Sequence, residues 1–509
     1  MNIKQAKEEI KNTVKAYLTK DAYGQYVIPI SRQRPVFLLG APGIGKTAIM
    51  EQIAQELGIS MVSYSMTHHT RQSALGLPFI VKKAYGEMEC NVTEYTMSEI
   101  IATIHDVMEE SGIRQGILFL DEINCVSETL SSTMLEFLQY KRFGKHHVPE
   151  GWIVVTAGNP PEFNNSVHEY DIATWDRLKK INVEPDFNVW KEYAYSRGVH
   201  VAIINYLEMK PDKFYEIEST PEGKRFVTAR GWEDLSDMIK LYEQNEIPVD
   251  NTLISQYVQH SKIARDFANY LILFQKYKAD YKVEQILAGK VPVQTKDMVA
   301  KAGFDERLSL VGLLLDSCDT KCKDVMEQNQ VLKEAFNSFV AIKDELARNI
   351  PASQAIDNAI NRNNERIRIG KASNSMSKND MNILMRCNTC LEETLPDMQG
   401  TSAESFKALK KAFASLKKNT ATAAGKVNKI LANLFAFADN VVQDDRMTSI
   451  IVSEMTVRVN VSSFVTHYGC PEYYAHNKKL LFYEREKELK DMIETLDLGD
   501  LDNETPSDH

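Results

Sequence analysis

The sequence predicts an α/β fold in which a parallel sheet is covered by helices on both faces, followed by a mostly α-helical C-terminal region. Up to about residue 185, short continuous apolar runs alternate with segments of helical periodicity, a pattern typical of buried parallel strands joined by helices. After Phe187 the strand signals fade and apolar residues recur every three or four positions, which predicts helices. A length of 509 residues allows roughly two to four domains.

The first part of the chain is predicted to contain five strands, at Pro35–Leu39, Ile59–Tyr64, Gly116–Leu120, Trp152–Ala157 and Lys180–Val183. Helices are predicted between them, for example at Thr47–Leu57, Ser98–Glu110 and Glu128–Gln139. Glycine and proline in the stretch from Leu287 to Asp297 indicate a boundary between helical regions. We therefore predict an α/β domain with an N-terminal helix at 1–185, a helical region at 186–290, a helical C-terminal domain at 291–496 and an acidic, disordered tail at 497–509.

The composition is that of an ordinary globular protein. The chain is 43% hydrophobic and 26% charged, and its net charge of −10 disfavours wrapping nucleic acid with the whole surface. It contains no apolar run of about 18 residues, and its N-terminal segment lacks the apolar core of a signal peptide. We expect a cytoplasmic protein without membrane contacts, whose seven cysteines stay reduced.

A phosphate-binding loop is predicted at residues 40–47, which read GAPGIGKT and follow an apolar strand. This stretch fits the pattern G-x-x-x-x-G-K-[ST], in which glycines let backbone N–H groups converge on an anion. The helix that follows presents the positive end of its dipole to the same phosphates. Lys46 is expected to contact the β- and γ-phosphates, and the Thr47 hydroxyl to ligate Mg²⁺. The residues expected to hold the nucleotide are Gly40, Ala41, Pro42, Gly43, Ile44, Gly45, Lys46, Thr47 and Ala48.

Two adjacent carboxylates follow the strand in GILFLDEIN, at Asp121 and Glu122. Such residues are costly in a core but suit the carboxyl edge of a parallel sheet, where phosphate ligands gather. Asp121 is expected to hold the hydrated Mg²⁺ beside the nucleotide, and Glu122 to orient or deprotonate the attacking water. This pair predicts hydrolysis in addition to binding.

Three more polar residues follow in the order that such a site requires. The strand WIVVTAGNP ends at Asn159, whose carboxamide could hydrogen-bond the γ-phosphate and the attacking water, although Asn-Pro-Pro also reads as a simple turn. Arg177 lies just before the last predicted strand, and Arg230 lies at the start of a helix in the second region. A lone arginine is most often solvated, so the order of the motifs is what draws attention to these two.

Residues 30 to about 290 resemble an AAA+ ATPase of the MoxR-like, dynein-related group. The matching segments are GAPGIGKT, ILFLDEIN, VVTAGNPPE, ATWDRL and TARGWEDLSDMI, in the order of that family. The resemblance implies a P-loop NTPase fold with a three-layer parallel sheet and a helical lid, and ATP and Mg²⁺ as cofactors. The segment His69–Ile80 is similar to the insert that usually faces the central pore of these proteins, and His146–Trp152 is similar to another of their loops.

The resemblance also implies roles for the three polar residues above. Asn159 takes the place of sensor 1, and Arg230 takes the place of sensor 2. Arg177 takes the place of the arginine finger that reaches the nucleotide of a neighbouring subunit, although the usual D-R-F is D-R-L here. An arginine acting in trans requires an oligomer, and a closed ring completes every site at once. Members of this family usually form rings of six subunits.

The leading hypothesis is an ATPase that remodels, assembles or activates a partner protein, in the manner of a chaperone. A partner with a von Willebrand factor A domain is implied by the resemblance alone. The alternative is a nucleic-acid-associated motor that uses ATP or GTP with a separate nuclease or effector. DNA-stimulated, salt-dependent hydrolysis would favour that alternative. A third hypothesis, a scaffold that binds ATP and seldom hydrolyses it, is disfavoured by the presence of Glu122.

Cysteine pairs raise the question of a zinc site. The pairs Cys318 with Cys322 and Cys387 with Cys390 could together supply four thiolates, but both lie in helix-period sequence without a glycine-bearing knuckle. Buried or unreactive thiols are the simpler interpretation. The lysine-rich stretch at 405–429 is interpreted as a surface helix docked on the C-terminal core, with a basic face for nucleic acid or an acidic partner as the alternative.

Overall fold

The structure is a computed structural model that describes residues 1–478 apart from 87, 164–166, 168–169, 222 and 399–400, so the predicted tail at 497–509 lies outside the described residues. The chain forms two compact units. Of the described residues, the first contains 1–193, 210–265 and 330–415, and the second contains 194–209, 266–329 and 416–478. The predicted domain boundaries at 185, 290 and 496 remain predictions.

The first unit is built on a five-stranded parallel sheet, which confirms the predicted fold class. The strand order is β2-β5-β8-β1-β9. Its strands are β1 (Val36–Gly40), β2 (Ser60–Ser65), β5 (Gly116–Asp121), β8 (Trp152–Gly158) and β9 (Lys179–Val183). Each of them coincides with a predicted strand to within one residue at either end. The central position of β5, β8 and β1 explains why their sequences are almost continuously apolar.

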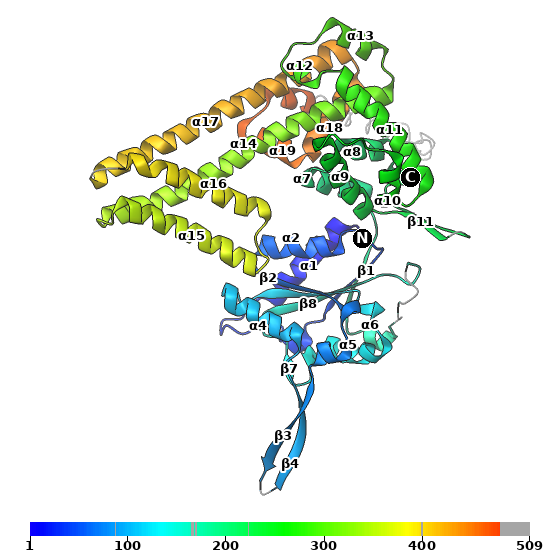
Figure 1. The fold of residues 1–509 in the computed structure, drawn as a ribbon, viewed down its shortest axis with the longest axis vertical. Helices are drawn as coiled ribbons and strands as arrows, with labels where there is room; N and C mark the ends of the chain where they lie inside the picture. Colours follow the sequence, from blue (N-terminus) through cyan, green and yellow to red (C-terminus); the bar gives the residue numbers. More distant parts are fainter. Residues whose placement is uncertain (87, 164–166, 168–169, 222, 399–400, 479–509) are drawn as a thin grey trace, which may run out of the picture. The chain divides into compact units, whose positions relative to one another are not determined.

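Helices cover both faces of this sheet, so the unit has three layers (Figure 1). On one face α1 (Ile3–Tyr17) and α2 (Lys46–Leu57) pack on alternate strand residues such as Leu38 and Phe119. On the other face α4 (Glu99–Ser111) and α5 (Glu128–Tyr140) pack on the residues between them, such as Phe37 and Leu118. Because the loops after the strands all leave at the carboxyl edge, the motif residues gather there.

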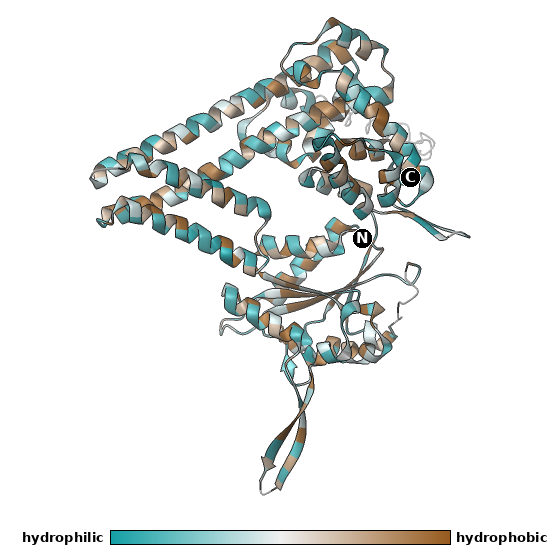
Figure 2. Cartoon of the chain, viewed as in Figure 1, coloured by the Kyte–Doolittle hydropathy of each residue, from teal (hydrophilic) through white to brown (hydrophobic). Residues whose placement is uncertain are grey.

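Two hairpins extend from the sheet domain. The longer, β3 (Pro78–Tyr85) with β4 (Met88–Tyr95), follows the short helix α3 (Arg71–Leu75) and projects away from the sheet in Figure 1. Both hydrophilic and hydrophobic residues occur along it (Figure 2), and its side chains are exposed or half-buried. The shorter hairpin pairs β6 (Arg142–Phe143) with β7 (His146–His147). The segments His69–Ile80 and His146–Trp152 overlap these hairpins only at Pro78–Ile80 and His146–His147.

The remaining parts of the first unit are mostly helical. A lid segment contains β10 (Glu216–Thr220), β11 (Gly223–Val227), α9 (Ala229–Gln244) and α10 (Asn251–Tyr257), and α7 (Phe187–Arg197) precedes it. A helical arm, residues 330–415, consists of the second half of α14 (Phe304–Ala347), then α15 (Ala352–Ala372), α16 (Lys378–Thr394) and the start of α17 (Ser402–Phe437). In the arm, Phe413 of α17 lies against Phe336 and Phe339 of α14.

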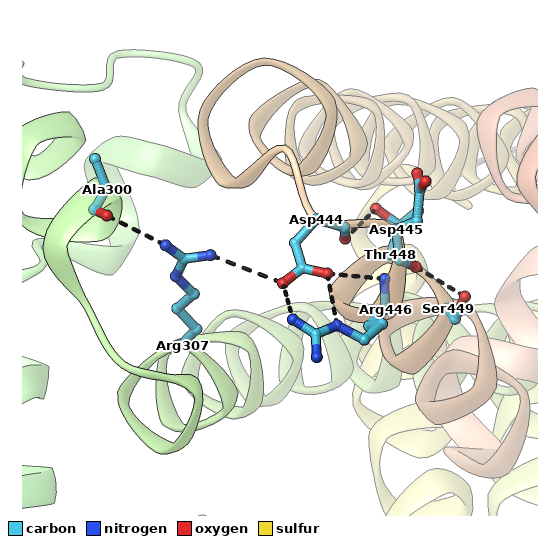
Figure 3. A network of polar contacts seen from close by, with 7 residues as sticks. All are labelled: Ala300, Arg307, Asp444, Asp445, Arg446, Thr448 and Ser449. Carbon is cyan, nitrogen blue, oxygen red and sulfur yellow. Dashed lines mark hydrogen bonds and ion pairs between the residues drawn. The ribbon is translucent and has the colours of Figure 1, made fainter.

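The second unit is a helical bundle. It contains α8 (Val201–Met209), α12 (Val283–Leu287), α13 (Val293–Lys301), α18 (Asp445–Val457) and α19 (Val459–Tyr468), with most of α11 (Ser261–Asp280) and parts of α14 and α17. Leucine, valine and phenylalanine side chains from these helices form its core. Figure 3 shows a polar network at its edge, in which Asp444 contacts both Arg446 and Arg307 while Arg307 donates to the carbonyl of Ala300. This network joins α13, α14 and α18.

Within the part of the chain that the structure describes, no helix is both long enough and apolar enough to cross a bilayer.

Candidate functional site

The side chain of Lys46 lies at the centre of the candidate site. It is the first residue of α2, directly after Gly45, whose φ of 93° is one that glycine tolerates. Its ammonium group donates to the carbonyl oxygens of Gly40 (2.7 Å) and Ala41 (2.9 Å) and to Oδ1 of Asn159 (2.9 Å). None of these three acceptors carries a charge, although the side chain is only 8% exposed. A buried cation with neutral partners at a helix N-terminus suits an anion such as a phosphate.

The electrostatics of Lys46 lead to the same conclusion. Burial lowers its pKa to about 8, the carboxylate of Asp121 opposes this shift, and the positive charge of Arg230 adds to it. The ammonium form is therefore disfavoured by its surroundings and would be stabilised by an incoming negative charge. Phosphate binding and protonation of Lys46 should be coupled.

This coupling predicts a pH dependence of nucleotide binding. Because bound phosphate raises the pKa of Lys46 above its value of about 8 in the free chain, affinity should be constant below that pH and fall above it by up to about tenfold per pH unit. Calorimetric titrations from pH 7 to 9.5, in buffers with different ionisation enthalpies, should also detect proton uptake on binding near pH 8.5.

A second buried lysine provides the control for this experiment. The pKa of Lys141 is also lowered to about 8 by burial, but its ammonium group donates to the backbone of Ile30 and Gln33. The pH dependence should persist in Lys141→Met. A pH-independent affinity in the parent chain would contradict the role given to Lys46.

Thr47 and Asp121 form a pair of oxygen groups beside Lys46. The Thr47 hydroxyl donates to Oδ2 of Asp121 at 3.0 Å, and both side chains are half-buried. Asp121 is the last residue of β5, and its other oxygen accepts the backbone N–H of Glu122 at 2.9 Å. A hydroxyl and a carboxylate at this distance are suitable ligands for Mg²⁺, which prefers oxygen donors and retains several waters.

Glu122 is held on the side of β5 that faces β2. Its Oε2 atom accepts hydrogen bonds from the hydroxyls of Ser65 (2.9 Å) and Thr67 (3.0 Å). Ser65 ends β2, and Thr67 lies in the short 3₁₀ helix Met66–His68 that follows. In the sheet order β2-β5-β8-β1, these hydroxyls lie on the opposite side of β5 from the strands that precede Asn159 and Lys46. The hydrogen bonds therefore fix the carboxylate on the β2 side of β5, although its charge still acts on Lys46.

The backbone of Glu122 adds to this constraint. Its φ is 55°, in the left-handed region that non-glycine residues rarely adopt. Such conformations persist only where the surroundings impose them, and they are concentrated at functional sites. The sequence did not single out Ser65 or Thr67, because a serine and a threonine after a strand are also ordinary turn residues.

Asn159 is positioned by a second asparagine that the sequence analysis did not single out. The amide of Asn124, which is buried, donates to the carbonyl oxygen of Asn159 at 2.8 Å. Gly158 leaves room for this contact, because a Cβ atom there would lie 2.3 Å from Oδ1 of Asn124. The Asn159 side chain can then reach Lys46, as described above. The motif DEIN contains the only sequence signal for Asn124, directly after the two carboxylates and one apolar residue.

The lid segment contacts the phosphate-binding loop directly. The backbone N–H of Arg230 donates to the carbonyl of Gly43 at 3.2 Å, and the Tyr215 hydroxyl donates to the carbonyl of Pro42 at 2.9 Å. A Cβ atom at Gly43, where φ is 73°, would lie 3.0 Å from the hydroxyl oxygen of Thr228. Thr228 caps α9 by accepting the N–H of Gly231. The capped helix places the exposed Arg230 side chain at the first turn of α9, close enough for its charge to affect Lys46.

Arg177 lies elsewhere on the first unit. It follows the short helix α6 (Ile172–Trp175), and its side chain is exposed. The segment is fixed by the buried Leu178 and by Trp175, whose ring contacts Phe37 edge-on at 5.2 Å between centroids. The backbone N–H of Arg177 donates to the carbonyl oxygen of Thr174, and its positive charge helps to lower the pKa of Asp171. The structure thus brings together the phosphate-loop residues, Asp121, Glu122, Asn159 and Arg230, whereas Arg177 is not brought into contact with Lys46.

The cysteines do not form a metal centre in the described ranges. Among residues 1–478 without the gaps given above, no group of three His, Cys, Asp or Glu side chains could hold a metal ion. Cys318 and Cys322 are fully buried in the core of the second unit, and burial raises the pKa of both thiols. Cys387 and Cys390 lie on α16, and burial raises their pKa values as well. Cys318, Cys322 and Cys387 are buried, as expected of unreactive core thiols, whereas Cys390 is half-buried.

Comparisons with known proteins agree with this geometry. Residues 35–178 match a family model described as "AAA domain (dynein-related subfamily)". The chain is also 23% identical over 310 residues to "Chaperone protein ClpB" of Helicobacter hepaticus, a match that covers 60% of this chain and 33% of that protein. The matched region therefore spans about a third of the relative's length. The parallel sheet, the glycine-rich loop and the family match together show that the chain carries an AAA domain of the α/β P-loop (AAA+) fold.

Proposed function

We propose that the protein binds ATP with Mg²⁺ and hydrolyses it at the carboxyl edge of the five-stranded sheet. This proposal rests mainly on the buried Lys46. The three hydrogen-bond acceptors of its ammonium group are neutral, and it lies beside the Thr47–Asp121 pair. Both groups suit a magnesium-bound triphosphate. The family match over residues 35–178 supports the same assignment.

Each residue has a distinct role in this proposal. Backbone N–H groups of residues 40–48 and the ammonium group of Lys46 bind the phosphates, and Thr47 and Asp121 hold Mg²⁺, which neutralises charge on the phosphate oxygens. Glu122 orients the attacking water and accepts its proton once its carboxylate leaves the hydroxyls of Ser65 and Thr67. Asn159, which accepts a hydrogen bond from Lys46, and Arg230, whose charge acts on Lys46, would contact the terminal phosphate.

We further propose that the active unit is an oligomeric ring. Within the described part of the chain, no hydrogen bond or ion pair joins the exposed Arg177 to the Lys46 site of its own subunit. An arginine that stabilises the transferring phosphoryl group must reach it, so Arg177 would act on the nucleotide of a neighbouring subunit. A ring closes this head-to-tail contact at every subunit, and six is the number expected for a MoxR-like protein.

The substrate of the ring is proposed to be a protein. The β3–β4 hairpin exposes Phe79, Ile80, Tyr85 and Met88, and Ile80 is 75% exposed. Apolar side chains on a projecting hairpin suit contact with a polypeptide, whereas phosphate recognition would require a row of basic residues. Remodelling of a partner protein is also consistent with the similarity to a chaperone, and a von Willebrand factor A domain protein is a candidate partner.

The proposal predicts capture of a protein client. The full chain with Glu122→Gln, which should bind ATP without hydrolysing it, is used as bait in the presence of ATP and Mg²⁺, and the retained proteins are identified. The same bait with Ile80→Ser and Met88→Ser on the hairpin is the matched control, and it should lose the client. DNA or RNA as the retained component would favour the nucleic-acid alternative, and absence of both ATP binding and phosphate release would refute the proposed activity.

A further inference from the structure

The turn between α15 and α16 of the helical arm reaches the open edge of the sheet. The carbonyl oxygen of Ser373 accepts a hydrogen bond from the backbone N–H of Met61, at 2.9 Å. Met61 belongs to β2, an edge strand whose other side pairs with β5. Ser373 is fully buried in this position although it lies more than 300 residues further along the chain. The turn therefore occupies part of the edge that a sixth strand would take (Figure 1).

A second contact fixes the same turn. Arg368, one turn before the end of α15, donates to the carbonyl oxygen of Glu110 at 3.0 Å. This carbonyl belongs to the last turn of α4, where carbonyl groups lack partners within the helix and a cation is favourable. The C-terminal end of α15 thus caps α4. Helix α4 is itself joined to β2 by the Tyr64 and Thr103 hydroxyls, which lie 2.7 Å apart.

Close packing and hydrogen bonds define the conformation of the turn. Gly370 lies in the last turn of α15, and a Cβ atom there would be 2.5 Å from Cβ of Met376. The Ser373 hydroxyl donates to the carbonyl of Ile369 and contacts the Ser375 hydroxyl. Asn374, with a φ of 53°, reverses the chain. These close contacts hold the Ser373 carbonyl in line with Met61.

The strand that receives this contact is the strand that restrains Glu122. Ser65 is four residues after Met61 in the same strand, about 13 Å along it. The hydroxyls of Ser65 and Thr67 bind the Glu122 carboxylate on the β2 side of β5, as described above. A displacement of β2 at Met61 would therefore be transmitted to the two hydroxyls through the backbone of one short, stiff strand.

We propose that the α15–α16 turn is a positioning element for Glu122: seated on β2, it keeps the carboxylate restrained, and movement of the arm off β2 releases it for hydrolysis. This inference rests on the proposed ATPase function. It gives the arm a regulatory role, because any partner that pulls the arm from the sheet edge would raise the rate of hydrolysis. Binding of a client to the arm, residues 330–415, would then change the rate of hydrolysis at the active site.

The test compares kcat at saturating ATP for full-length variants. Arg368→Ala removes the cap on α4, and Gly370→Ala forces the turn away from Met376. Arg362→Ala is the matched arginine control, since Arg362 pairs with Glu345 inside the arm. Gly425→Ala is the matched glycine control, because a Cβ atom there would meet nothing within 4 Å. Arg368→Lys should restore the behaviour of the parent chain, because it keeps a donor at Glu110.

We expect kcat to rise about threefold in Arg368→Ala and in Gly370→Ala, while nucleotide affinity stays unchanged. A change of this size corresponds to the free energy of one exposed hydrogen bond. The double variant Ser65→Ala/Thr67→Ala should show a similar rise. When the arm substitutions are added to that double variant, no further rise should occur, because both act through the same restraint. The inference is wrong if the arm substitutions raise kcat by the same factor in the Ser65→Ala/Thr67→Ala background. It is also wrong if neither arm substitution changes kcat.

Amide hydrogen exchange separates this inference from the proposed activity. Residues 60–67 should exchange faster in Gly370→Ala than in Gly425→Ala, whether or not the chain hydrolyses ATP. If the parent chain hydrolyses ATP and β2 exchange and kcat are both unchanged in the arm variants, the inference fails and the ATPase stands. If the parent chain releases no phosphate, the proposed ATPase activity is wrong. In that case the exchange experiment still tests the inference, because unchanged exchange of residues 60–67 in Gly370→Ala would refute the link between the arm and β2.

Discussion

Glu122→Gln is expected to lower kcat by about a thousandfold, or about 4 kcal/mol of activation free energy, while leaving nucleotide affinity unchanged. The amide cannot accept a proton from the attacking water. It is isosteric, however, and its carbonyl oxygen can still accept hydrogen bonds from the Ser65 and Thr67 hydroxyls, so the local structure should persist. Single-turnover measurement of phosphate release, together with calorimetric ATP binding, separates the two quantities.

The control for this substitution is Glu128→Gln. Glu128 is an exposed residue in the first turn of α5, six positions further along the chain. It should retain the parent rate. If Glu122→Gln hydrolysed ATP at the parent rate, Glu122 would not be the catalytic carboxylate. A loss of both binding and hydrolysis would instead indicate that the substitution damages the loop.

Arg177→Ala is expected to have an effect of similar size, a fall in kcat of about a thousandfold or more, if Arg177 stabilises the transferring phosphate. Nucleotide affinity and subunit stability should change little, because the side chain is exposed. Arg34→Ala provides the matched control, since Arg34 is also exposed and lies 3.8 Å from Asp176, the neighbour of Arg177. Hydrolysis at the parent rate by Arg177→Ala would remove it from the mechanism.

Mixing two inactive variants tests whether Arg177 acts between subunits. A Lys46→Ala subunit has no functional phosphate site but can still supply Arg177 to its neighbour. An Arg177→Ala subunit can bind ATP but cannot supply the arginine. With random mixing in equal amounts, about a quarter of the interfaces in a ring should combine both intact parts, so hydrolysis should reappear. Continued inactivity of assembled mixed rings would instead place the arginine in the site of its own chain.

The sheet and the phosphate loop could be predicted because their signals are local. Strands such as β5 and β8 are buried on both faces, so each reads as a continuous apolar run whatever the rest of the chain does. The glycine-rich loop is specified by backbone geometry at a strand–helix junction, and a short motif records it. Lys46, Asp121, Glu122 and Asn159 were found for this reason, since each follows directly on one of these strands or on this loop.

The contacts that restrain or cover the site could not be predicted, because they depend on tertiary structure. Ser65 and Thr67 acquire their role only when β2 pairs with β5, and Tyr215 only when the lid meets Pro42. Ser373 contacts β2 across more than 300 residues, and its backbone carbonyl is the group involved, so no side-chain pattern records it. The β3–β4 hairpin was not predicted, because a ribbon exposed on both faces carries no buried apolar run of the kind that marks the strands of the sheet.

The contact between Ser373 and β2 has a further consequence, for the colloidal behaviour of the protein. The border strand of a sheet presents unpaired backbone groups on which a strand from another molecule can add, which is a common route to aggregation. Here a helical turn, which cannot continue the ladder of hydrogen bonds, is seated over the first residues of that border. The arm thus covers one end of this edge strand, where a strand from another molecule could otherwise pair.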